Sequence, residues 1–323
     1  MTTLTDIARE AHVSKMTVSR VINHPEQVSA DVRELVEKVI DSLGYTPNRA
    51  ALALTQSRHY VIQFLILEDI ETVEPYYAKL LIYLAEELQR LGYSLEIGHN
   101  RQVEVNHVDG LIVVGGRQTD IPFLQTLGKP VVTYGSLGPA IPFVDVDNSL
   151  GTYMATTYLL EQGIENIYYV GVKLPEYFAL ARLVGYLGAI NKFQTPRHVH
   201  QILNNEKQAF QLIRHLDIKP NSAFVAATDR IAMGLLNGLA LNKIKVPETV
   251  SVIGFDGIFL NQITSQRLTT VQQPLKEIAQ ALIDSLLVQL EGQPAENRLL
   301  RPHLVFGGTT SDHQPNLVPL VET

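Results

Sequence analysis

Residues 3–23 read T-L-T-D-I-A-R-E-A-H-V-S-K-M-T-V-S-R-V-I-N, a stretch that predicts two short helices around a tight turn. The apolar residues of the first helix recur at i, i+3, i+4 and i+7 and form one stripe: Leu4, Ile7, Ala8 and Ala11. Thr3 is placed to cap this helix, with Asp6 at the acidic third position. The pair of helices therefore predicts a small all-α unit at the start of the chain.

The second helix is expected to begin after Ser14 as its cap. Its apolar residues share one face: Val18, Val21 and Ile22. The other face is small, polar or cationic, which suits entry into a DNA major groove: Lys15, Met16, Thr17, Ser19, Arg20 and Asn23. We expect Arg20 to read a guanine, and Lys15 and Met16 to set the preference among related sites. A solvated helix face is the alternative that this stretch leaves open by itself.

A third helix is predicted to start at Ser29 and to stop at Gly44. Its expected inward residues are Val32, Leu35, Val36, Val39, Ile40 and Leu43. Residues 45–54 follow as Y-T-P-N-R-A-A-L-A-L. Together, V-S-x-x-T-V-S-R-V-[IL]-N, V-S-x-x-x-R and G-Y-x-P-N-x-x-A make residues 3–54 resemble the headpiece and hinge of the lactose-repressor (LacI/GalR) family of bacterial transcription regulators.

The resemblance implies a sequence-specific repressor that binds a palindromic operator as a homodimer. It implies that the following residues contact DNA: Thr5, Ser14, Lys15, Met16, Thr17, Ser19, Arg20, Asn23, Ser29, Asn48, Arg49, Ala51 and Leu54. Residues 48–54 are expected to be helical only on the operator, because isolated helices below about 12–15 residues are marginal. Leu54 is expected to wedge into the minor groove and bend the DNA.

The charge of the chain is unusual for a DNA-binding protein. The 323 residues carry a net charge of −7 at pH 7. Residues 1–58 hold seven Lys and Arg against seven Asp and Glu, so the acidity lies in the remainder. We therefore expect the headpiece to use helix N-termini, hydroxyls and a few cations on phosphates, and to gain affinity by dimerisation.

Composition predicts a cytoplasmic protein. The chain has no cysteine, which excludes disulfides and thiolate metal sites. Its N-terminus lacks the features of a signal peptide, and no run of 18 apolar residues predicts a membrane span. Polar residues and prolines follow Gly308 instead of a leucine heptad tail, so a dimer is favoured over a tetramer.

From residue 58 onward, apolar β-branched runs alternate with helical segments, which predicts an α/β fold with parallel sheets covered on both faces. Two such series predict two doubly wound lobes with a ligand cleft beyond the strands' carboxyl ends. The resemblance implies a periplasmic-binding-protein-like core with three crossings between lobes, near Asn148, Gln273 and Leu300. The expected domains are a headpiece (1–46), a hinge (47–57) and a core (58–323), with an N-lobe of 58–148 and 274–300 and a C-lobe of 149–273 and 301–323.

Two residues lead the expected effector site. Arg182 stands three residues before Gly185, as does the family's effector-binding arginine, and a guanidinium fork suits vicinal hydroxyls or a carboxylate. Asp256 follows a strand, where its carboxylate can accept hydrogen bonds from sugar hydroxyls. A surface arginine and a helix or turn cap are the alternatives. The other expected effector contacts are Thr228, Gln273, Tyr76, Tyr134, Asp69 and Phe178.

The chain departs from the family at two points of this site. Gly135 stands where the family often has an effector-contacting aspartate. There is no tryptophan to stack on a sugar. The candidate stacking rings are Tyr76, Tyr77, Tyr134, Phe178 and Phe255.

The predicted function is a sugar-responsive repressor that its effector releases from DNA. Residues 100–106 are too few for the helix usual before V-D-G-L-I. With the preceding E-P-Y-Y they resemble the subgroup that includes the evolved β-galactosidase repressor, which favours a galactoside. The alternative is a co-repressor-dependent regulator that binds a nucleobase or a phosphorylated carrier protein.

Other chemistry finds little support. Residues 145–149 (D-V-D-N-S) start like a calcium loop, but Leu150 and Thr156 stand where the glycine and the bidentate glutamate belong. His198 and His200 alternate on an expected strand without a further ligand, so we expect them to be solvated. The sequence carries no nucleophile elbow, phosphate loop or paired-carboxylate motif. We therefore predict no enzyme, no cofactor and no metal.

Overall fold

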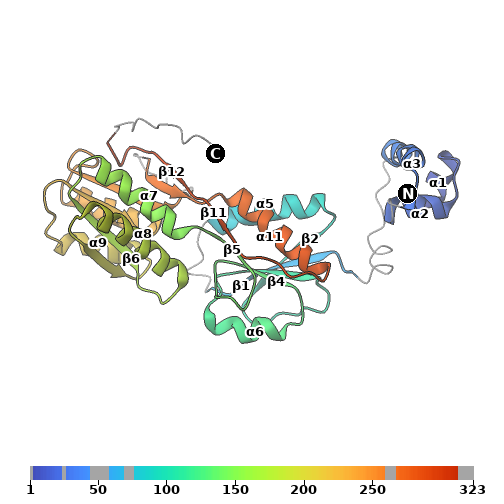
Figure 1. The fold of residues 1–323 in the computed structure, drawn as a ribbon, viewed down its shortest axis with the longest axis horizontal. Helices are drawn as coiled ribbons and strands as arrows, with labels where there is room; N and C mark the ends of the chain where they lie inside the picture. The colour runs from blue at the N-terminus through green and yellow to red at the C-terminus, as the bar shows by residue number, and fades with distance from the viewer. Residues whose placement is uncertain (1–2, 24–26, 44–57, 69–75, 259–266, 312–323) are drawn as a thin grey trace. The chain divides into compact units, whose positions relative to one another are not determined.

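The computed structural model describes residues 3–23, 27–43, 58–68, 76–258 and 267–311, and the chain forms two compact units, 1–60 and 61–323 (Figure 1). The expected hinge helix lies outside the described residues. So do five of the expected contact residues: Asn48, Arg49, Ala51, Leu54 and Asp69.

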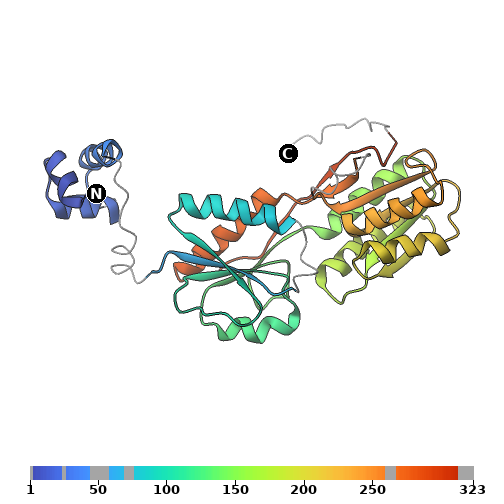
Figure 2. The same cartoon turned by 180° about the vertical axis from the view of Figure 1, so that it is seen from behind.

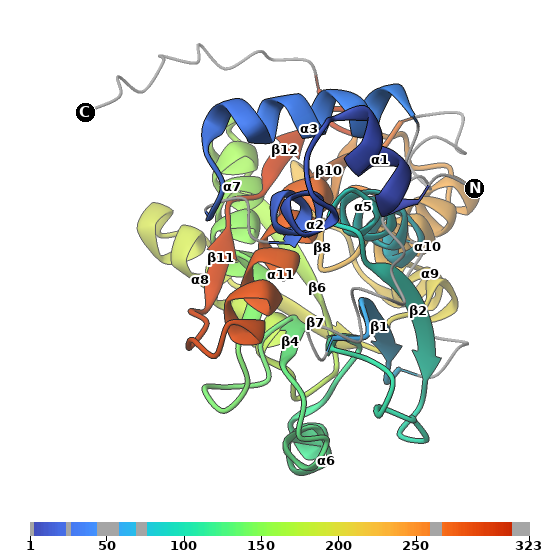
Figure 3. The same cartoon turned by 90° about the vertical axis from the view of Figure 1, so that its right-hand side faces the viewer.

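The first unit is a bundle of three mutually packed helices (Figure 3). They are α1 (Leu4–Glu10), α2 (Lys15–Asn23) and α3 (Ala30–Ser42). The expected capping of α1 is confirmed, because Asp6 N donates to Thr3 Oγ1 at 3.3 Å and Thr3 N donates to Asp6 Oδ2 at 2.9 Å. Ser14 caps α2, since Thr17 N donates to Ser14 Oγ at 3.0 Å. The core of the unit consists of Ile7, Ala8, Ala11, Val18, Val21 and Val36.

One expectation for α3 is wrong. Leu35 and Leu43 do not face the core but are 46% and 37% exposed in this chain. Val36 is buried at the contact with the other helices, and Leu35 points about 100° away from it on the helix. Leu43 is the C-cap, beyond the last turn that the small core can cover.

The first lobe of the second unit is built on a sheet of order β2-β1-β3-β4-β5-β11, whose neighbouring strands are all parallel. Its strands are β1 (Val61–Ile66), β2 (Ser94–His99), β3 (Gly110–Val114), β4 (Val131–Tyr134), β5 (Phe143–Val146) and β11 (Arg298–Leu300). Its helices are α5 (Tyr76–Arg90), the 3-10 turn η2 (Gln118–Asp120), α6 (Ile121–Thr126) and α11 (Leu275–Leu290). Helices α5 and α11 lie side by side on one face of the sheet and α6 covers the other (Figure 1).

The second lobe repeats this plan with the order β7-β6-β8-β9-β10-β12. Its strands are β6 (Asn166–Val172), β7 (His198–Ile202), β8 (Ser222–Ala226), β9 (Val250–Asp256), β10 (Thr269–Gln272) and β12 (His303–Val305). Its helices are α7 (Asn148–Glu161), α8 (Tyr177–Phe193), α9 (Glu206–His215) and α10 (Asp229–Leu241). Helices α7 and α8 pack together on one face, and α9 and α10 on the other (Figure 3).

The predicted fold class, two doubly wound lobes after a helical headpiece, is confirmed. The sheet of the second lobe is not purely parallel, because the edge strand β12 pairs antiparallel with β10. The chain passes from the first sheet to the second after Val146, returns after Gln272 and passes again after Leu300 (Figure 2). These passages put Asn148 and Gln273 where the two lobes meet.

The two histidines of β7 differ from the expectation of solvated side chains. His198 and His200 are half-buried rather than solvated, because their rings stack on Tyr168 with centroids 4.6 and 6.2 Å away. Burial lowers the pKa of both imidazoles below its usual range. In the described part of the chain, no helix is long and apolar enough to cross a bilayer.

Candidate functional site

A cavity of about 1050 Å³ lies at the carboxyl ends of strands from both sheets of the second unit. In doubly wound folds the crevice at this edge is the usual ligand site. The expected effector residues in its wall are Tyr76, Tyr134, Phe178, Arg182, Thr228, Asp256 and Gln273. The structure therefore brings together every expected effector residue that it describes.

Arg182 lies on α8 and is 5% exposed, which rules out the alternative of a surface arginine. Its Nε donates to Asn148 Oδ1 at 2.8 Å, its Nη1 donates to the carbonyl of Ala227, and its Nη2 lies 3.3 Å from Asp256 Oδ1. The Cζ atom of Arg182 lies 3.6 Å from the centroid of Phe255. The protein therefore fixes the guanidinium from several sides and leaves part of its five-donor fork for a ligand.

The close packing of α7 and α8 sets the position of Arg182. Gly185 follows Arg182 by one helical turn, and a Cβ atom there would clash with the carbonyl of Ser149 on α7. A glycine is required at this position because only its missing side chain lets the two helices approach so closely.

Asp256 ends β9 with a φ of +119°, a conformation that costs a non-glycine residue about 1–3 kcal/mol. Gln273 holds it from the neighbouring strand end, because its Nε2 donates to Asp256 Oδ1 at 2.9 Å and its backbone N to Asp256 O at 3.3 Å. Such strain persists where the surroundings over-determine a residue, as at ligand clamps.

Asp229, which the sequence reasoning missed, stabilises the turn that follows Asp256. It is fully buried, accepts from Thr270 Oγ1 at 2.6 Å and accepts from the backbone N of Ile258 at 3.0 Å. Burial, and next the negative charge of Asp256, raise the pKa of its carboxyl well above the usual range. Asp229 thus ties the turn after Asp256 to the start of α10.

Tyr134 and Gln273 connect the two lobes. The hydroxyl of Tyr134, at the end of β4, donates to Gln273 Oε1. Burial raises the pKa of the Tyr134 phenol well above its usual range, so the hydroxyl stays protonated as a donor. A hydrogen-bonded chain therefore runs from Tyr134 through Gln273 and Asp256 to Arg182.

Asp145 and Asn148 also belong to the cleft wall, although neither was predicted as a contact residue. Asp145 accepts from Val146 N at 2.7 Å, Ser136 N at 3.2 Å and Asn148 Nδ2 at 3.2 Å. Burial raises the pKa of Asp145 to about 6 in spite of these bonds. Their signal in the sequence is the D-V-D-N-S segment, whose first two residues end β5 and whose pattern resembles the start of a calcium loop.

Thr228 has a different role from a simple ligand contact. Its Oγ1 accepts from Ile231 N at 3.1 Å and so caps α10, and it donates to Asn204 Oδ1 at 2.7 Å. Both Thr228 and Asn204 line the cavity. The hydroxyl thus fixes the amide of Asn204, which the sequence did not single out.

Aromatic rings form another part of the wall. Tyr76 meets Tyr77 and Tyr134 edge to face, with centroids 4.8 and 6.1 Å away. Phe178 lies under the guanidinium of Arg182, whose Cζ is 5.2 Å from the ring centroid. These rings offer apolar surface beside hydrogen-bonding groups, as a pyranose ring requires.

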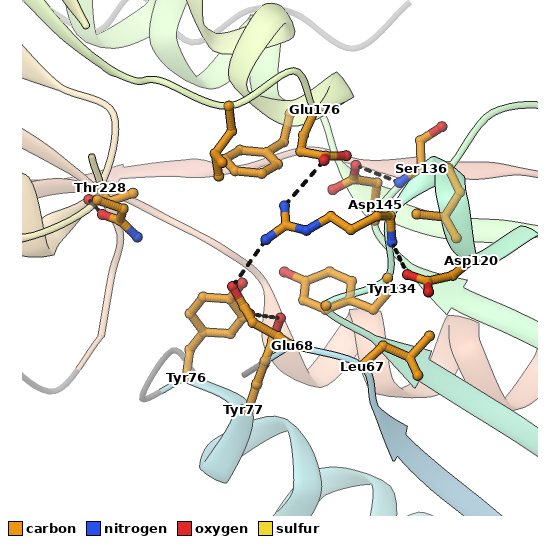
Figure 4. Close-up of a pocket in the computed structure, with 18 of the residues that line it drawn as sticks. Leu67, Glu68, Tyr76, Tyr77, Asp120, Tyr134, Ser136, Asp145, Glu176 and Thr228 are labelled. Atoms are coloured by element: carbon orange, nitrogen blue, oxygen red, sulfur yellow. Dashed lines mark hydrogen bonds and ion pairs between the residues drawn. The ribbon is translucent and has the colours of Figure 1, made fainter. Parts of the chain in front are cut away.

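A second polar group, here called the rim network, consists of Glu68, Arg101, Arg117, Asp120 and Glu176. Nη2 of Arg117 lies 3.6 Å from Glu68 Oε1, and its Nη1 lies 3.4 Å from Glu176 Oε1. Glu68 and Arg117 follow β1 and β3 of the first lobe, whereas Glu176 precedes α8 of the second. Figure 4 shows Glu68 and Glu176 on opposite sides of the arginine side chain to which dashed lines join them, beside Tyr134.

The rim network continues through Asp120. This carboxylate accepts from Arg117 N at 2.7 Å and from Arg101 Nε at 2.8 Å. The side chain of Arg117 is 34% exposed and that of Arg182 is 6% exposed, so the rim network is more accessible to solvent than the surroundings of Arg182. Arg117 and Asp120 share the turn η2, but Glu68, Arg101 and Glu176 come from separate connections, so no local motif marks the network as a whole.

In the first unit, most of the expected DNA contacts lie on α2 or at its N-cap. Met16 is 64% exposed, Ser14, Lys15 and Arg20 are exposed, and Thr17 and Ser19 are half-buried. Thr5 and Ser29 are exposed at the starts of α1 and α3, and Asn23 ends α2 with its side chain outside the described residues. Of the α2 residues predicted to face outward, Lys15, Met16 and Arg20 are exposed, whereas Thr17 and Ser19 are partly covered.

Comparisons with known proteins agree with both units. Residues 3–48 match the family described as bacterial regulatory proteins, lacI family, and residues 156–310 match a periplasmic binding protein-like domain. The chain is 39% identical over 315 residues to an uncharacterized HTH-type transcriptional regulator, YvdE, of Bacillus subtilis, which covers 96% of this chain and 100% of that protein. It is 30% identical over 336 residues to the HTH-type transcriptional repressor CytR of Escherichia coli, with 95% and 96% covered.

Solved structures are similar over both units as well. The transcriptional regulator CelR in complex with cellobiose has a TM-score of 0.70 at 26% identity, covering 96% of this chain and all of that one. The lac repressor dimer, bound to operator and the anti-inducer ONPF, has a TM-score of 0.69 at 24% identity, with 96% and 99% covered.

Proposed function

The chain belongs to the lacI family of DNA-binding transcriptional regulators and is not an enzyme, and we propose that it is a repressor which a small sugar releases from a palindromic operator. In the proposal the protein acts in the cytoplasm. It is a homodimer, because two headpieces are needed to read two half-sites.

The observation that carries the proposal is the buried chain of hydrogen bonds from Tyr134 through Gln273 and Asp256 to Arg182. It offers donors and acceptors of fixed geometry beside aromatic rings, which suits a ligand that is both hydroxyl-rich and apolar-faced. The described wall carries four arginines and five acidic residues, so the charges nearly balance and favour an uncharged ligand.

Relatives support a sugar. A solved relative is the complex of CelR with cellobiose, and a relative in Haemophilus influenzae, 28% identical, is a ribose operon repressor. Within sugars, galactosides are the first to test, since residues 100–109 connect β2 and β3 without the helix that the family usually carries there.

Induction follows from where the residues lie. Tyr134 and Glu68 belong to the first lobe and Arg182 to the second, so a ligand that contacts both shifts the equilibrium between lobe orientations by its differential affinity. The hinge segment leads directly into β1 of the first lobe, and a changed lobe orientation is then passed to the paired hinges of a dimer.

The test uses the full-length protein and an operator selected from random DNA duplexes. Sugars that raise the thermal midpoint are titrated against operator binding by fluorescence anisotropy. We expect an active sugar to weaken operator binding by about 5–150-fold, the usual range of allosteric coupling, and the operator to weaken sugar binding by the same factor. Tighter operator binding with the sugar, or a response to nucleobases alone, would establish the co-repressed alternative.

A further inference from the structure

The rim network has a composition that points to a specific kind of ligand. Its two arginines and three carboxylates, with Arg230 in the same wall, give a balanced charge. A phosphate or carboxylate on the ligand would meet three carboxylates there, whereas hydroxyls would find both donors and acceptors. Guanidinium groups have five donors and carboxylates about four acceptor sites, so paired side chains still have capacity for hydroxyl groups.

The cavity has space for more than one ring. Its volume of about 1050 Å³ slightly exceeds the range of about 300–1,000 Å³ that is usual for ligand pockets. If one pyranose ring binds against Arg182 and Asp256, the part of the cavity beside Arg117 is filled by water. A second ring linked to the first has space there.

The rim network also joins the lobes. Arg117 of the first lobe lies between Glu68 of the same lobe and Glu176, which immediately precedes α8. The same helix carries Arg182, less than two turns further along the chain. A ligand group that contacts Arg117 and Glu176 therefore acts on the helix that holds the first ring.

We infer that the effector is an uncharged saccharide of at least two rings, and that Glu68, Arg117 and Glu176 form the subsite for its second ring. This inference rests on the proposed function and deepens it. The first ring binds the buried residues around Arg182, and the second ring binds between the lobes, so ligand length decides how strongly the lobes are coupled.

The experiment compares D-glucose and D-galactose with cellobiose, maltose, lactose and melibiose by isothermal titration calorimetry on the full-length protein. The variants are Arg117→Ala and Glu176→Gln, so that one remains if the other unfolds. The control is Arg298→Ala, which removes an arginine of the first lobe that is also ion-paired, to Asp284 at 3.4 Å, but lies outside the cavity wall.

We expect at least one disaccharide to bind about tenfold more tightly than its constituent monosaccharide to the unaltered protein and to the control. Arg117→Ala and Glu176→Gln should each remove most of this advantage and change monosaccharide affinity by less than about twofold. Equal affinity for one and two rings, or an equal loss for both in the variants, overturns the inference and leaves the sugar-released repressor standing. If none of these saccharides and no other sugar binds, the proposed function itself fails.

Discussion

Arg182 Nη2 lies 3.3 Å from Asp256 Oδ1, and both side chains are almost fully buried in the wall of the cleft. A buried ion pair adds little stability by itself, but removal of one partner leaves an uncompensated charge and costs about 3–5 kcal/mol. If the proposed function is right, effector recognition and the stability of the second lobe both depend on this pair.

The first prediction separates these two roles. Arg182→Ala should abolish the response to sugar and also lower the free energy of unfolding by about 3–5 kcal/mol, because Asp256 stays buried without its cation. The double variant Arg182→Ala/Asp256→Ala should recover part of that stability without recovering sugar binding. Urea denaturation and calorimetry measure the two effects, and a double variant less stable than the single one would contradict the assigned pairing.

The second prediction concerns the contact between α7 and α8. Gly185→Ala should destabilise the protein by about 1–3 kcal/mol, because the added methyl group meets the carbonyl of Ser149. The resulting shift of α8 should also weaken sugar binding, since Arg182 moves with the helix.

Gly188 provides a matched control on the same helix. A Cβ atom there lies 3.6 Å from the ring of Tyr153, an ordinary contact. Gly188→Ala should therefore stabilise the protein by up to about 1 kcal/mol through helix propensity. Equal effects of the two substitutions in urea denaturation would show that close packing at Gly185 is not what positions α8.

Much of the site around Arg182 and Asp256 was predictable from the sequence, because local motifs mark these residues. Arg182 and Asp256 stand in helix and strand-end motifs whose phase decides which way they point. Parallel strands then bring Gln273 and Asp256 together, since β9 and β10 are neighbours in register. The alternation of apolar runs with helices likewise predicted both lobes.

The rim network was not predictable from these patterns. Glu68, Arg117 and Glu176 lie in three connections far apart in the sequence, and single charged residues in loops are usually solvated. Their pairing depends on how the lobes approach each other, which no periodicity encodes. The antiparallel pairing of β12 was not predicted either, because a strand of three residues is too short to show a periodic pattern of apolar side chains.

The third prediction uses the raised pKa of Asp145, which burial moves from 3.8 to about 6. The folded protein binds this proton more strongly than the unfolded chain, so the contribution of Asp145 to stability falls as pH rises from about 4 to 6. This displacement corresponds to at most about 3 kcal/mol. Asp145→Asn cannot ionise, so its stability relative to the unaltered protein should increase over this range of pH.

Urea denaturation of both proteins at pH 4.5, 5.5, 6.5 and 7.5 tests this trend. The comparison cancels the titration of other groups, including Asp229, that both proteins share. A difference in stability that does not change with pH would mean that Asp145 keeps an ordinary pKa in the folded protein.

The last prediction concerns DNA reading by Arg20, which is exposed on the outward surface of α2. A bidentate contact to guanine is worth about 1–3 kcal/mol of discrimination. Arg20→Ala should therefore flatten the base preference at one position of each half-site, measured by competition among operator variants. A contact to phosphate would instead weaken all sequences equally and reduce the salt dependence of binding.

Lys38→Ala is the matched control, because it removes one positive charge from an exposed, ion-paired residue of α3. This variant should keep the full sequence preference of the unaltered protein. Measurement of both variants at two salt concentrations separates charge from base reading, since only the loss of a phosphate contact changes the slope against salt. If Arg20→Ala retains the complete preference at every position, another residue of α2, with Lys15 and Met16 first, must read the operator.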